Sequence, residues 1–357
     1  MKITGNKGEW SELYALLKLL ALGKLYTANE FGEKEDSIFF PVLKILRDER
    51  ESGHLSFVLS PKTRSVDFYV EEQQRDSFEA NWVSDSAESV YSGILGGRGS
   101  AFEIEGAADI MDKMNLKRIK AISDDKADII IQIHDIKTGY EPICGFSIKS
   151  DLGNPPTLLN ASKATNFTYE LNNISDDNME KINNIETKTK IIDRINAIFN
   201  IGSMRYLGMH NQIFRSNLML IDTIMDRIIA EMLLHYYKGE GDTCKELIDI
   251  LETQNPLRYP RNGCYEYKLK KFLYSVALGM VPAKLWDGLD QANGGYVIVK
   301  QNGDVLAFHL YNKNAFETYL LNNTKFEKAS TSRNDFATIY SNKGRKLINL
   351  NLQIRFV

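Results

Sequence analysis

The sequence predicts a mixed α/β fold, with a central mixed sheet flanked by helices, a helical insertion and a β-rich C-terminal part. Three observations support this class. Short apolar runs at residues 54–59 and 65–70, split by Pro61, predict strands. Apolar residues recur at helical spacing from about 180 to 280. Asn302-Gly303 between two apolar runs predicts a hairpin near the C-terminus.

The other elements follow from the same rules. Helices are expected at residues 10–25, 75–93, 105–115 and 213–237. Gly23 is the expected end of the first helix, because glycine is a common helix stop signal. The alternating tail INLNLQIRF predicts a strand.

The domain limits are set by changes of pattern, because no Pro/Ser-rich linker marks a boundary. We expect residues 1–180 to form a core with the first helix and a central hairpin. We expect residues 181–285 to be mainly helical, and residues 286–357 to be β-rich and to contribute to ligand recognition.

Composition excludes several classes of protein. With 43% hydrophobic and 25% charged residues, the chain is neither fibrous nor wholly disordered. The formal net charge of -3 excludes a highly basic, histone-like protein but not a local basic cleft. Three scattered cysteines and no apolar run of about 20 residues predict a cytoplasmic protein without a membrane segment.

The hairpin expected at residues 128–149 concentrates polar groups on one face. With a four-residue loop from Lys137 to Tyr140, Asp128 lies opposite Lys149 and Ile130 opposite Ser147. One face is then uniformly apolar, and the other carries Asp128, Ser147 and Lys149. A loop of odd length would destroy this sorting.

An acid and a lysine at the end of such a hairpin form a recurring nuclease arrangement, written P-D…(D/E)-x-K. Asp128 would hold a divalent metal ion such as Mg²⁺, the carbonyl of Ile148 would add a ligand, and Lys149 would assist the attacking water. Ala127 replaces the usual proline, and Ser147 stands where the second acid usually stands. A solvated Asp–Lys pair and an ordinary strand serine are the alternatives.

The first helix offers the missing carboxylate. Glu12 and Glu9 border its apolar stripe, where a carboxylate needs a partner or a metal. Lys7-Gly8-x-x-x-Glu12 matches a pattern with which helices deliver an acid to a nuclease metal, so Glu12 is the first choice and Glu9 the second. Helix capping is the alternative for both. Asp151 and Glu170 are weaker candidates.

Three segments together resemble the HpaII-type type II restriction endonucleases, in the expected order and over nearly the whole chain. They are NKGEWSELYALLKLLALGKLY, GFSIKSDLGNPPTLLNASKATNFTYEL, and FEKASTSRNDFATIY followed by LNLQIRF. The resemblance implies a restriction-endonuclease-like PD-(D/E)XK core and a homodimeric, Mg²⁺-dependent enzyme that cuts both strands of double-stranded DNA at 5′-CCGG. It also implies a DNA methyltransferase that protects the host site.

The resemblance carries Asp128 and Lys149 as catalytic positions, with Ser147 in place of the usual acid. Some restriction enzymes with S-x-K place the acid about fourteen residues after the lysine, but that position here is Lys163. The second acid must therefore come from elsewhere.

Candidate DNA contacts share side chains that can bond phosphates or base edges. They are Arg98, Asn160, Ser162, Lys163, Asn166, Lys325, Ser332 and Arg333. Arg333 is the first choice for reading a base, because arginine can bond O6 and N7 of guanine together. Turn and capping chemistry is the alternative for the Asn and Ser residues. A structure-selective repair or junction nuclease, or an inactive DNA-binding protein, would be the alternative functions.

Overall fold

The computed structural model describes residues 3–49, 53–60, 62–121 and 127–357. Internal contacts divide the chain into two compact units, Met1–Pro156 with Asp290–Phe316, and Thr157–Leu289 with Glu317–Val357. The mixed α/β class expected from the sequence is confirmed. The three ranges expected from the sequence stay a prediction; in the structure the hairpin within Asp290–Phe316 pairs with a strand of the first unit.

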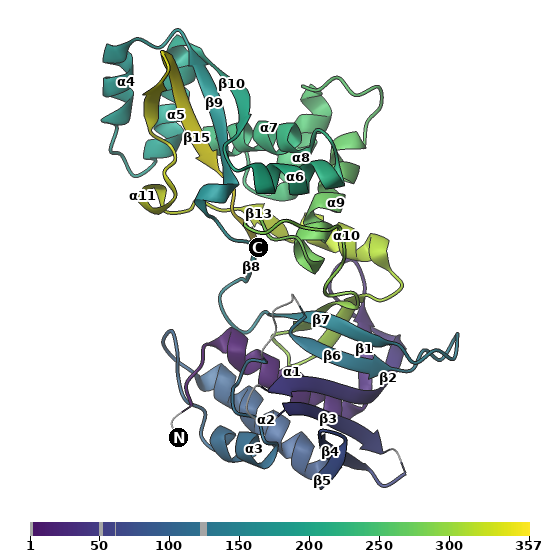
Figure 1. The fold of residues 1–357 in the computed structure, drawn as a ribbon. Helices are drawn as coiled ribbons and strands as arrows, with labels where there is room; N and C mark the ends of the chain where they lie inside the picture. The colour runs from purple at the N-terminus through teal and green to yellow at the C-terminus, as the bar shows by residue number, and fades with distance from the viewer. Residues whose placement is uncertain (1–2, 50–52, 61, 122–126) are drawn as a thin grey trace. The chain divides into compact units, whose positions relative to one another are not determined.

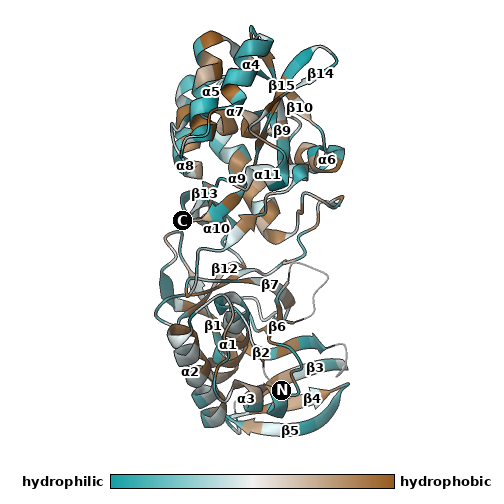
Figure 2. Ribbon diagram, turned by 90° about the vertical axis from the view of Figure 1, so that its left-hand side faces the viewer, coloured by the Kyte–Doolittle hydropathy of each residue, from teal (hydrophilic) through white to brown (hydrophobic). Residues whose placement is uncertain are grey.

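The first unit contains a nine-stranded mixed sheet in the order β1-β12-β11-β7-β6-β2-β3-β4-β5 (Figure 1). Strand β1 also pairs with β2, so the strands from β1 to β2 in this order close into a barrel-like ring. The strands are β1 (Lys24–Ala28), β2 (Lys34–Glu49), β3 (Gly53–Ser60), β4 (Ser65–Val70), β5 (Gln73–Glu79), β6 (Ile129–Ile133), β7 (Ile143–Ser150), β11 (Gly295–Val299) and β12 (Val305–His309). The edge strand β5 is largely hydrophilic, as an exposed edge requires (Figure 2).

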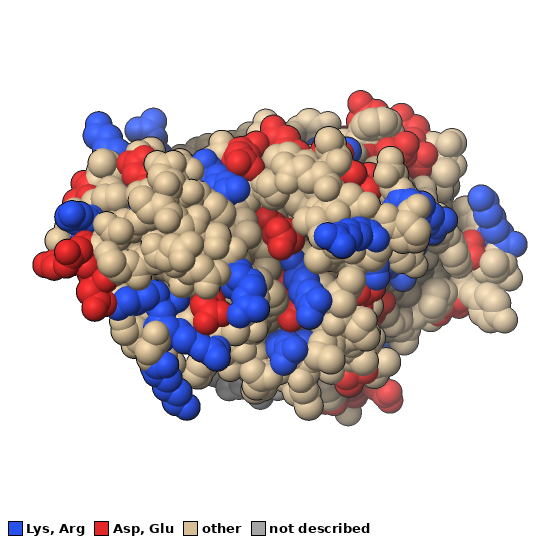
Figure 3. Space-filling view, turned by 90° about the horizontal axis from the view of Figure 1, so that it is seen from above, with Lys and Arg blue, Asp and Glu red and all other residues tan. Residues whose placement is uncertain are grey.

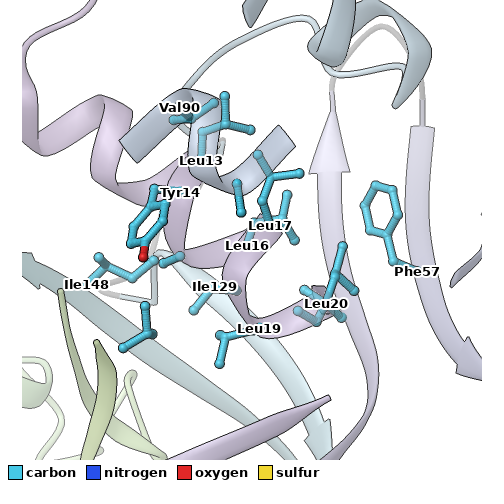
Figure 4. Close-up of a cluster of buried hydrophobic side chains, with 14 of the residues drawn as sticks. Leu13, Tyr14, Leu16, Leu17, Leu19, Leu20, Phe57, Val90, Ile129 and Ile148 are labelled. Carbon is cyan, nitrogen blue, oxygen red and sulfur yellow. The ribbon is translucent and has the colours of Figure 1, made fainter. Parts of the chain in front are cut away.

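Helix α1 (Lys7–Leu22) forms the centre of the core of this unit. Asn6 and Glu9 form a capping box at its start, and Gly23 ends it as predicted, in the left-handed conformation. Its leucines pack against α2 (Ala80–Gly96) and the sheet, where Val90 and Ile129 lie among them (Figure 4). A third helix, α3 (Ala107–Lys113), contacts α2.

The long strand β2 changes partner in its middle. Lys24 of β1 lies opposite Pro41, whereas Val42 lies opposite Ile133 of β6. Pro41 has no N–H to donate, and its carbonyl accepts a hydrogen bond from the backbone of His134. The sequence analysis did not identify β1 or β2.

The register predicted for the hairpin β6–β7 is wrong by two residues. Ile129 lies opposite Phe146 and Ile130 opposite Gly145, so the register places Asp128 opposite Ser147 rather than Lys149. The turn begins earlier than predicted, because the carboxylate of Asp135 accepts hydrogen bonds from the backbone of Lys137 and the hydroxyl of Thr138. A shift of two leaves every side chain on its predicted face.

The second unit contains two antiparallel sheets, in the orders β10-β9-β15-β14 and β13-β16-β8. Its strands are β8 (Thr157–Leu159), β9 (Asn166–Asn172), β10 (Ser203–Met209), β13 (Thr324–Phe326), β14 (Ile339–Asn342), β15 (Arg345–Asn351) and β16 (Ile354–Phe356). Its helices are α4 (Asp176–Asn183), α5 (Lys190–Ile201), α6 (Gln212–Ile221), α7 (Met225–Lys238), α8 (Cys244–Gln254), α9 (Cys264–Leu278) and α11 (Thr331–Asn334), with the 3₁₀ turn Lys163–Thr165. Helix α10 (Lys313–Asn322) crosses the boundary between the units.

Three predicted elements need correction. Residues 75–79 belong to strand β5, so the helix expected at 75–93 begins at Ala80. The helix expected at 213–237 is interrupted at Asp222, whose carboxylate accepts a hydrogen bond from the backbone of Ile224 and so competes with helical bonding. The tail forms two strands, β15 and β16, in different sheets.

One further prediction agrees with the structure in kind. The Asn302-Gly303 turn joins the antiparallel strands β11 and β12. Within the described residues, the structure contains no helix that is long and apolar enough to cross a membrane.

Candidate active site and recognition surface

A cleft of about 790 Å³ opens in the first unit beside the start of β6. It is lined by side chains from the beginning of α1, by the glycine-rich segment 97–100 and by the end of β7. Asp128, Glu12 and Lys149 all line it, although they come from three different elements. The structure thus brings together the principal residues that the sequence singled out.

Asp128 is fixed where β6 begins. Its backbone N–H donates to the carbonyl of Phe146. Its Oδ2 accepts hydrogen bonds from Ser147 Oγ at 3.0 Å and from the backbone N–H of Ile148 at 2.8 Å. The other oxygen, Oδ1, accepts neither of these two hydrogen bonds.

Lys149 lies on the same face of the hairpin as Asp128. Its Nζ donates to Ser147 Oγ at 3.2 Å and lies 5.4 Å from the centre of the Tyr296 ring. Burial lowers the pKa of Lys149, although the nearby Asp128 opposes this effect. Burial disfavours the charged form of an amine, so Lys149 holds its proton less tightly than an exposed lysine does.

Ser147 does not act as the missing acid. It is buried, and its hydroxyl connects Lys149 to Asp128 through two hydrogen bonds. We infer that it positions both functional groups, which a strand serine in this register can do without a charge.

Glu12 reaches the cleft from the first turns of α1. Its side chain is 11% exposed. Among the described residues its Oε2 is one of the few buried side-chain atoms without a hydrogen-bond partner. Burial and the neighbouring Asp128 raise the pKa of Glu12 to about 7, against the opposing effect of Lys120. The helix is held beside β7 by the hydroxyls of Ser11 and Ser150, which lie 2.7 Å apart.

Glu9 is not brought into the cleft. Its carboxylate accepts a hydrogen bond from the backbone N–H of Asn6 at 2.8 Å and so completes the capping box. The capping alternative therefore describes Glu9, and of the two glutamates Glu12 lines the cleft.

Lys120 is a cleft residue that the sequence analysis missed. Its Nζ lies 3.4 Å from Glu12 Oε1 and 3.6 Å from Asp128 Oδ1. It follows no strand and matches no motif, so no sequence signal pointed to it. Its pKa is raised, because the two carboxylates outweigh the effect of burial.

The donor set fits a divalent cation with oxygen ligands. Glu12 and Asp128 supply carboxylate oxygens, one of them buried without a partner. The N–H of Ile148 points toward Asp128, and in a strand the carbonyl of the same residue points to the same side. Within the described residues no group of three or more His, Cys, Asp or Glu side chains could hold a metal. Mg²⁺ is commonly bound by only one or two carboxylates, with water and phosphate oxygens completing its shell.

Comparison with known proteins gives a direct assignment. The sequence profile described as HpaII restriction endonuclease matches residues 6–356. The chain is 40% identical over 359 aligned residues to the type II restriction enzyme HpaII of Haemophilus parainfluenzae, and the match covers 99% of both chains. The chain belongs to the HpaII restriction endonuclease family. No solved structure matches it.

As a member of the HpaII family the chain is a type II restriction endonuclease, a hydrolase that cleaves double-stranded DNA. Enzymes of this class generally use a divalent metal ion, in agreement with the oxygen-rich donor set of the cleft.

The second unit of this HpaII-family enzyme brings two distant candidate DNA-binding segments together. Asn166 Nδ2 donates to the carbonyl of Asn334 at 2.7 Å, and Lys163 forms an ion pair with Asp335. Asn351 donates to the carbonyl of Ser162 at 2.8 Å. Ser162 and Asn166 therefore hold the segments together, and Ser332 and Arg333 are left exposed on α11.

These segments border the open face of the sheet β10-β9-β15-β14. Tyr169 of β9 points to the other face, where its hydroxyl donates to the carbonyl of Ala230 in α7. Because side chains alternate along a strand, Glu170 points to the open face. There it pairs with Arg205 Nη2 at 2.5 Å and with Arg345 Nε at 3.4 Å. We call this surface, with Ser332 and Arg333, the open sheet face; the sequence analysis did not identify Arg205 or Arg345.

The remaining candidates lie elsewhere. Lys325 is on β13 in the three-stranded sheet, and Asn160 is exposed just after β8. Arg98 is exposed in the first unit between Gly97 and Gly99, which line the cleft. Basic and acidic side chains are interspersed on the face seen in Figure 3. That face therefore carries no broad patch of positive charge that would attract DNA.

Proposed function

We propose that this protein is a Mg²⁺-dependent PD-(D/E)XK endonuclease that cuts both strands of DNA at 5′-CCGG. It would act as a homodimer in a restriction–modification system, with a DNA methyltransferase that protects the host site. The observation that carries the proposal is the convergence of Asp128, Glu12 and Lys149 on one cleft. The 40% sequence identity to HpaII over 99% of the chain supports the choice of substrate.

In this proposal Asp128, Glu12 and the carbonyl of Ile148 would hold the Mg²⁺ ion. The bound ion would polarise the scissile phosphate and lower the pKa of a water molecule. Glu12 must lose its proton for this role, which its raised pKa of about 7 permits in neutral and weakly alkaline solution.

Lys149 would orient the attacking water and offset negative charge that develops on the phosphate. Ser147 keeps Lys149 and Asp128 in register through its two hydrogen bonds. In-line attack of water on phosphorus breaks the bond to the 3′ oxygen and leaves a 5′-phosphate and a 3′-hydroxyl.

The open sheet face would recognise the bases. Arginine bonds O6 and N7 of guanine, and a carboxylate accepts from N4 of cytosine, so Arg333, Arg205, Arg345 and Glu170 supply the groups that G·C pairs require. Lys163, Lys325, Asn160 and Arg98 would contact phosphates.

Cleavage of a plasmid with known CCGG sites tests the proposal. With Mg²⁺ we expect discrete fragments that end at CCGG, and loss of cutting in Lys149→Met by at least about a hundredfold. Asp151→Asn is the matched control, because Asp151 lies just beyond β7 but pairs with Lys300 at 2.9 Å. Fragments with other ends would contradict the specificity, and preferential cutting of branched DNA would favour a repair nuclease.

A further inference from the structure

Lys120 places a positive charge between the two carboxylates of the cleft. Its ammonium lies within 3.6 Å of an oxygen of each, and their side chains are only 11% and 13% exposed. Two carboxylates that share a poorly solvated site repel each other unless a cation lies between them. Among the residues that the structure describes, Lys120 forms an ion pair with both carboxylates.

The position of Lys120 is fixed by a buried ion pair behind it. Arg47 Nη2 donates to the carbonyl of Arg118 at 2.6 Å and to that of Ile119 at 3.2 Å. Arg47 Nε bonds Glu49 Oε1 at 2.9 Å, and both side chains are almost fully buried. The guanidinium therefore holds the two residues that immediately precede Lys120.

Such a clamp is unusual for a lysine that only solubilises a surface. Arg47 is a desolvated charge that bonds Glu49 through Nε and the main chain of one short segment through Nη2. A buried arginine of this kind is costly unless its partners are well placed. The side chain of Lys120 itself is 55% exposed, so it can leave the carboxylates without being removed from water.

We propose that Lys120 is a resident counter-cation that occupies the carboxylate pair of the metal-free enzyme and is displaced when the divalent ion binds. Arg47 is the positioning residue that holds it there. The inference rests on the proposed metal-dependent function. It goes further, because it assigns to a residue outside the P-D…(D/E)-x-K pattern a direct effect on metal affinity.

The charges determine the direction of the effect. An ammonium close to the ligand oxygens competes with the ion for them and repels its double charge. Removing the ammonium should therefore strengthen metal binding. If Lys120 merely supported the fold, its removal would weaken metal binding.

The test measures Ca²⁺ binding to the full-length protein by calorimetry without DNA, at pH 8.5, so that protonation of Glu12 does not interfere. We expect Lys120→Met and Lys120→Gln to bind Ca²⁺ at least about threefold more tightly than the parent protein. Lys120→Arg, which keeps the charge, should stay within about twofold. Lys117→Met is the matched control, because Lys117 is exposed on the same segment and does not line the cleft.

Arg47→Lys tests the positioning role. One ammonium cannot bond Glu49 and two carbonyls in the geometry of a guanidinium, so Lys120 should be held less firmly. We expect Ca²⁺ binding to shift in the same direction as in Lys120→Met, by a smaller factor, and to show no further shift when the two substitutions are combined.

Equal or weaker Ca²⁺ binding in both Lys120→Met and Lys120→Gln would overturn the inference. Failure of the parent and of both variants to reach saturation counts as equal binding. Saturation by the variants alone would support it. Plasmid cleavage by the parent protein separates the two levels of the argument. A parent that cuts CCGG with a failed Lys120 result removes only this inference, whereas a parent that cuts no DNA with Mg²⁺ removes the proposed function.

Discussion

The cleft of the first unit and the open sheet face of the second unit hold their charges in different ways. In the cleft, the carboxylates of Glu12 and Asp128 are 11% and 13% exposed. On the open sheet face, Arg205 and Arg345 are 69% and 57% exposed. The first site is ordered by burial and by several hydrogen bonds, whereas the second places exposed guanidinium groups around one poorly exposed carboxylate, that of Glu170, which is 14% exposed.

In the proposed function, the two surfaces have different tasks before the substrate arrives. Groups that stabilise a reacting phosphate are effective when they are fixed and poorly solvated in advance. Groups that read bases can remain solvated until DNA binds. The exposed ion pairs that they form before then contribute only about 0–1 kcal/mol to stability, so breaking them costs little. Substitutions in the cleft should therefore have large effects on catalysis, and those on the open sheet face should affect specificity.

Asp128→Asn should have the largest effect. It keeps the size of the side chain but removes the charge that would bind Mg²⁺, so we expect plasmid cleavage to fall by at least about a thousandfold. Circular dichroism should show an unchanged fold. A loss of less than tenfold would mean that the open sheet face and the cleft do not differ as described.

Glu12→Gln should change how stability depends on pH. The pKa of Glu12 is raised from 4.5 to about 7 in the folded protein, so the parent loses stability as the pH rises between these values, by up to about 3 kcal/mol. In EDTA, urea unfolding of Glu12→Gln should lack this loss between pH 5 and pH 8. Parallel stability curves for the two proteins would contradict a buried carboxylate in the cleft.

Arg333→Ala and Arg345→Ala test the open sheet face. Loss of a bidentate contact to guanine should weaken binding to a CCGG duplex in Ca²⁺ by about ten- to a hundredfold, with less effect on an unrelated duplex. Arg227→Ala is the matched control, because Arg227 is exposed on α7, which packs against the other face of the sheet. Equal losses for both duplexes would show contact with phosphates rather than with bases.

Glu9→Ala should have the smallest effect. It removes half of the capping box of α1 and should destabilise the protein by about 0.5–1 kcal/mol, while plasmid cleavage stays within about twofold. A large loss of cleavage with unchanged stability would return Glu9 to the candidate ligands.

Much of the cleft could be predicted because it depends on local patterns. Alternation along the hairpin placed Asp128, Ser147 and Lys149 on one face, and helical spacing placed Glu12 beside the apolar stripe of α1. The two-residue error in register arose because the Asp135 carboxylate accepts hydrogen bonds within the turn, so the turn begins earlier than expected. The alternation of side chains cannot reveal such an error, because a shift of two leaves each side chain on the same face.

The contributions of distant segments could not be predicted in the same way. Lys120 reaches the carboxylates because Arg47, more than seventy residues earlier, holds the chain before it. Strands β11 and β12 join the first unit through parallel pairing of β11 with β7. Residues Thr157–Leu289 of the second unit lie between β7 and β11 in sequence. Such contacts follow from the packing of the whole chain and leave no local pattern.

The central claim is that α1 supplies the acid that Ser147 cannot. Anomalous diffraction from a crystal with Mn²⁺ and a CCGG duplex tests it most directly. The claim predicts a peak about 2.1 Å from carboxylate oxygens of both Glu12 and Asp128. A metal bound by Asp128 while Glu12 remains on Lys120, or a peak that neither residue contacts, would contradict it.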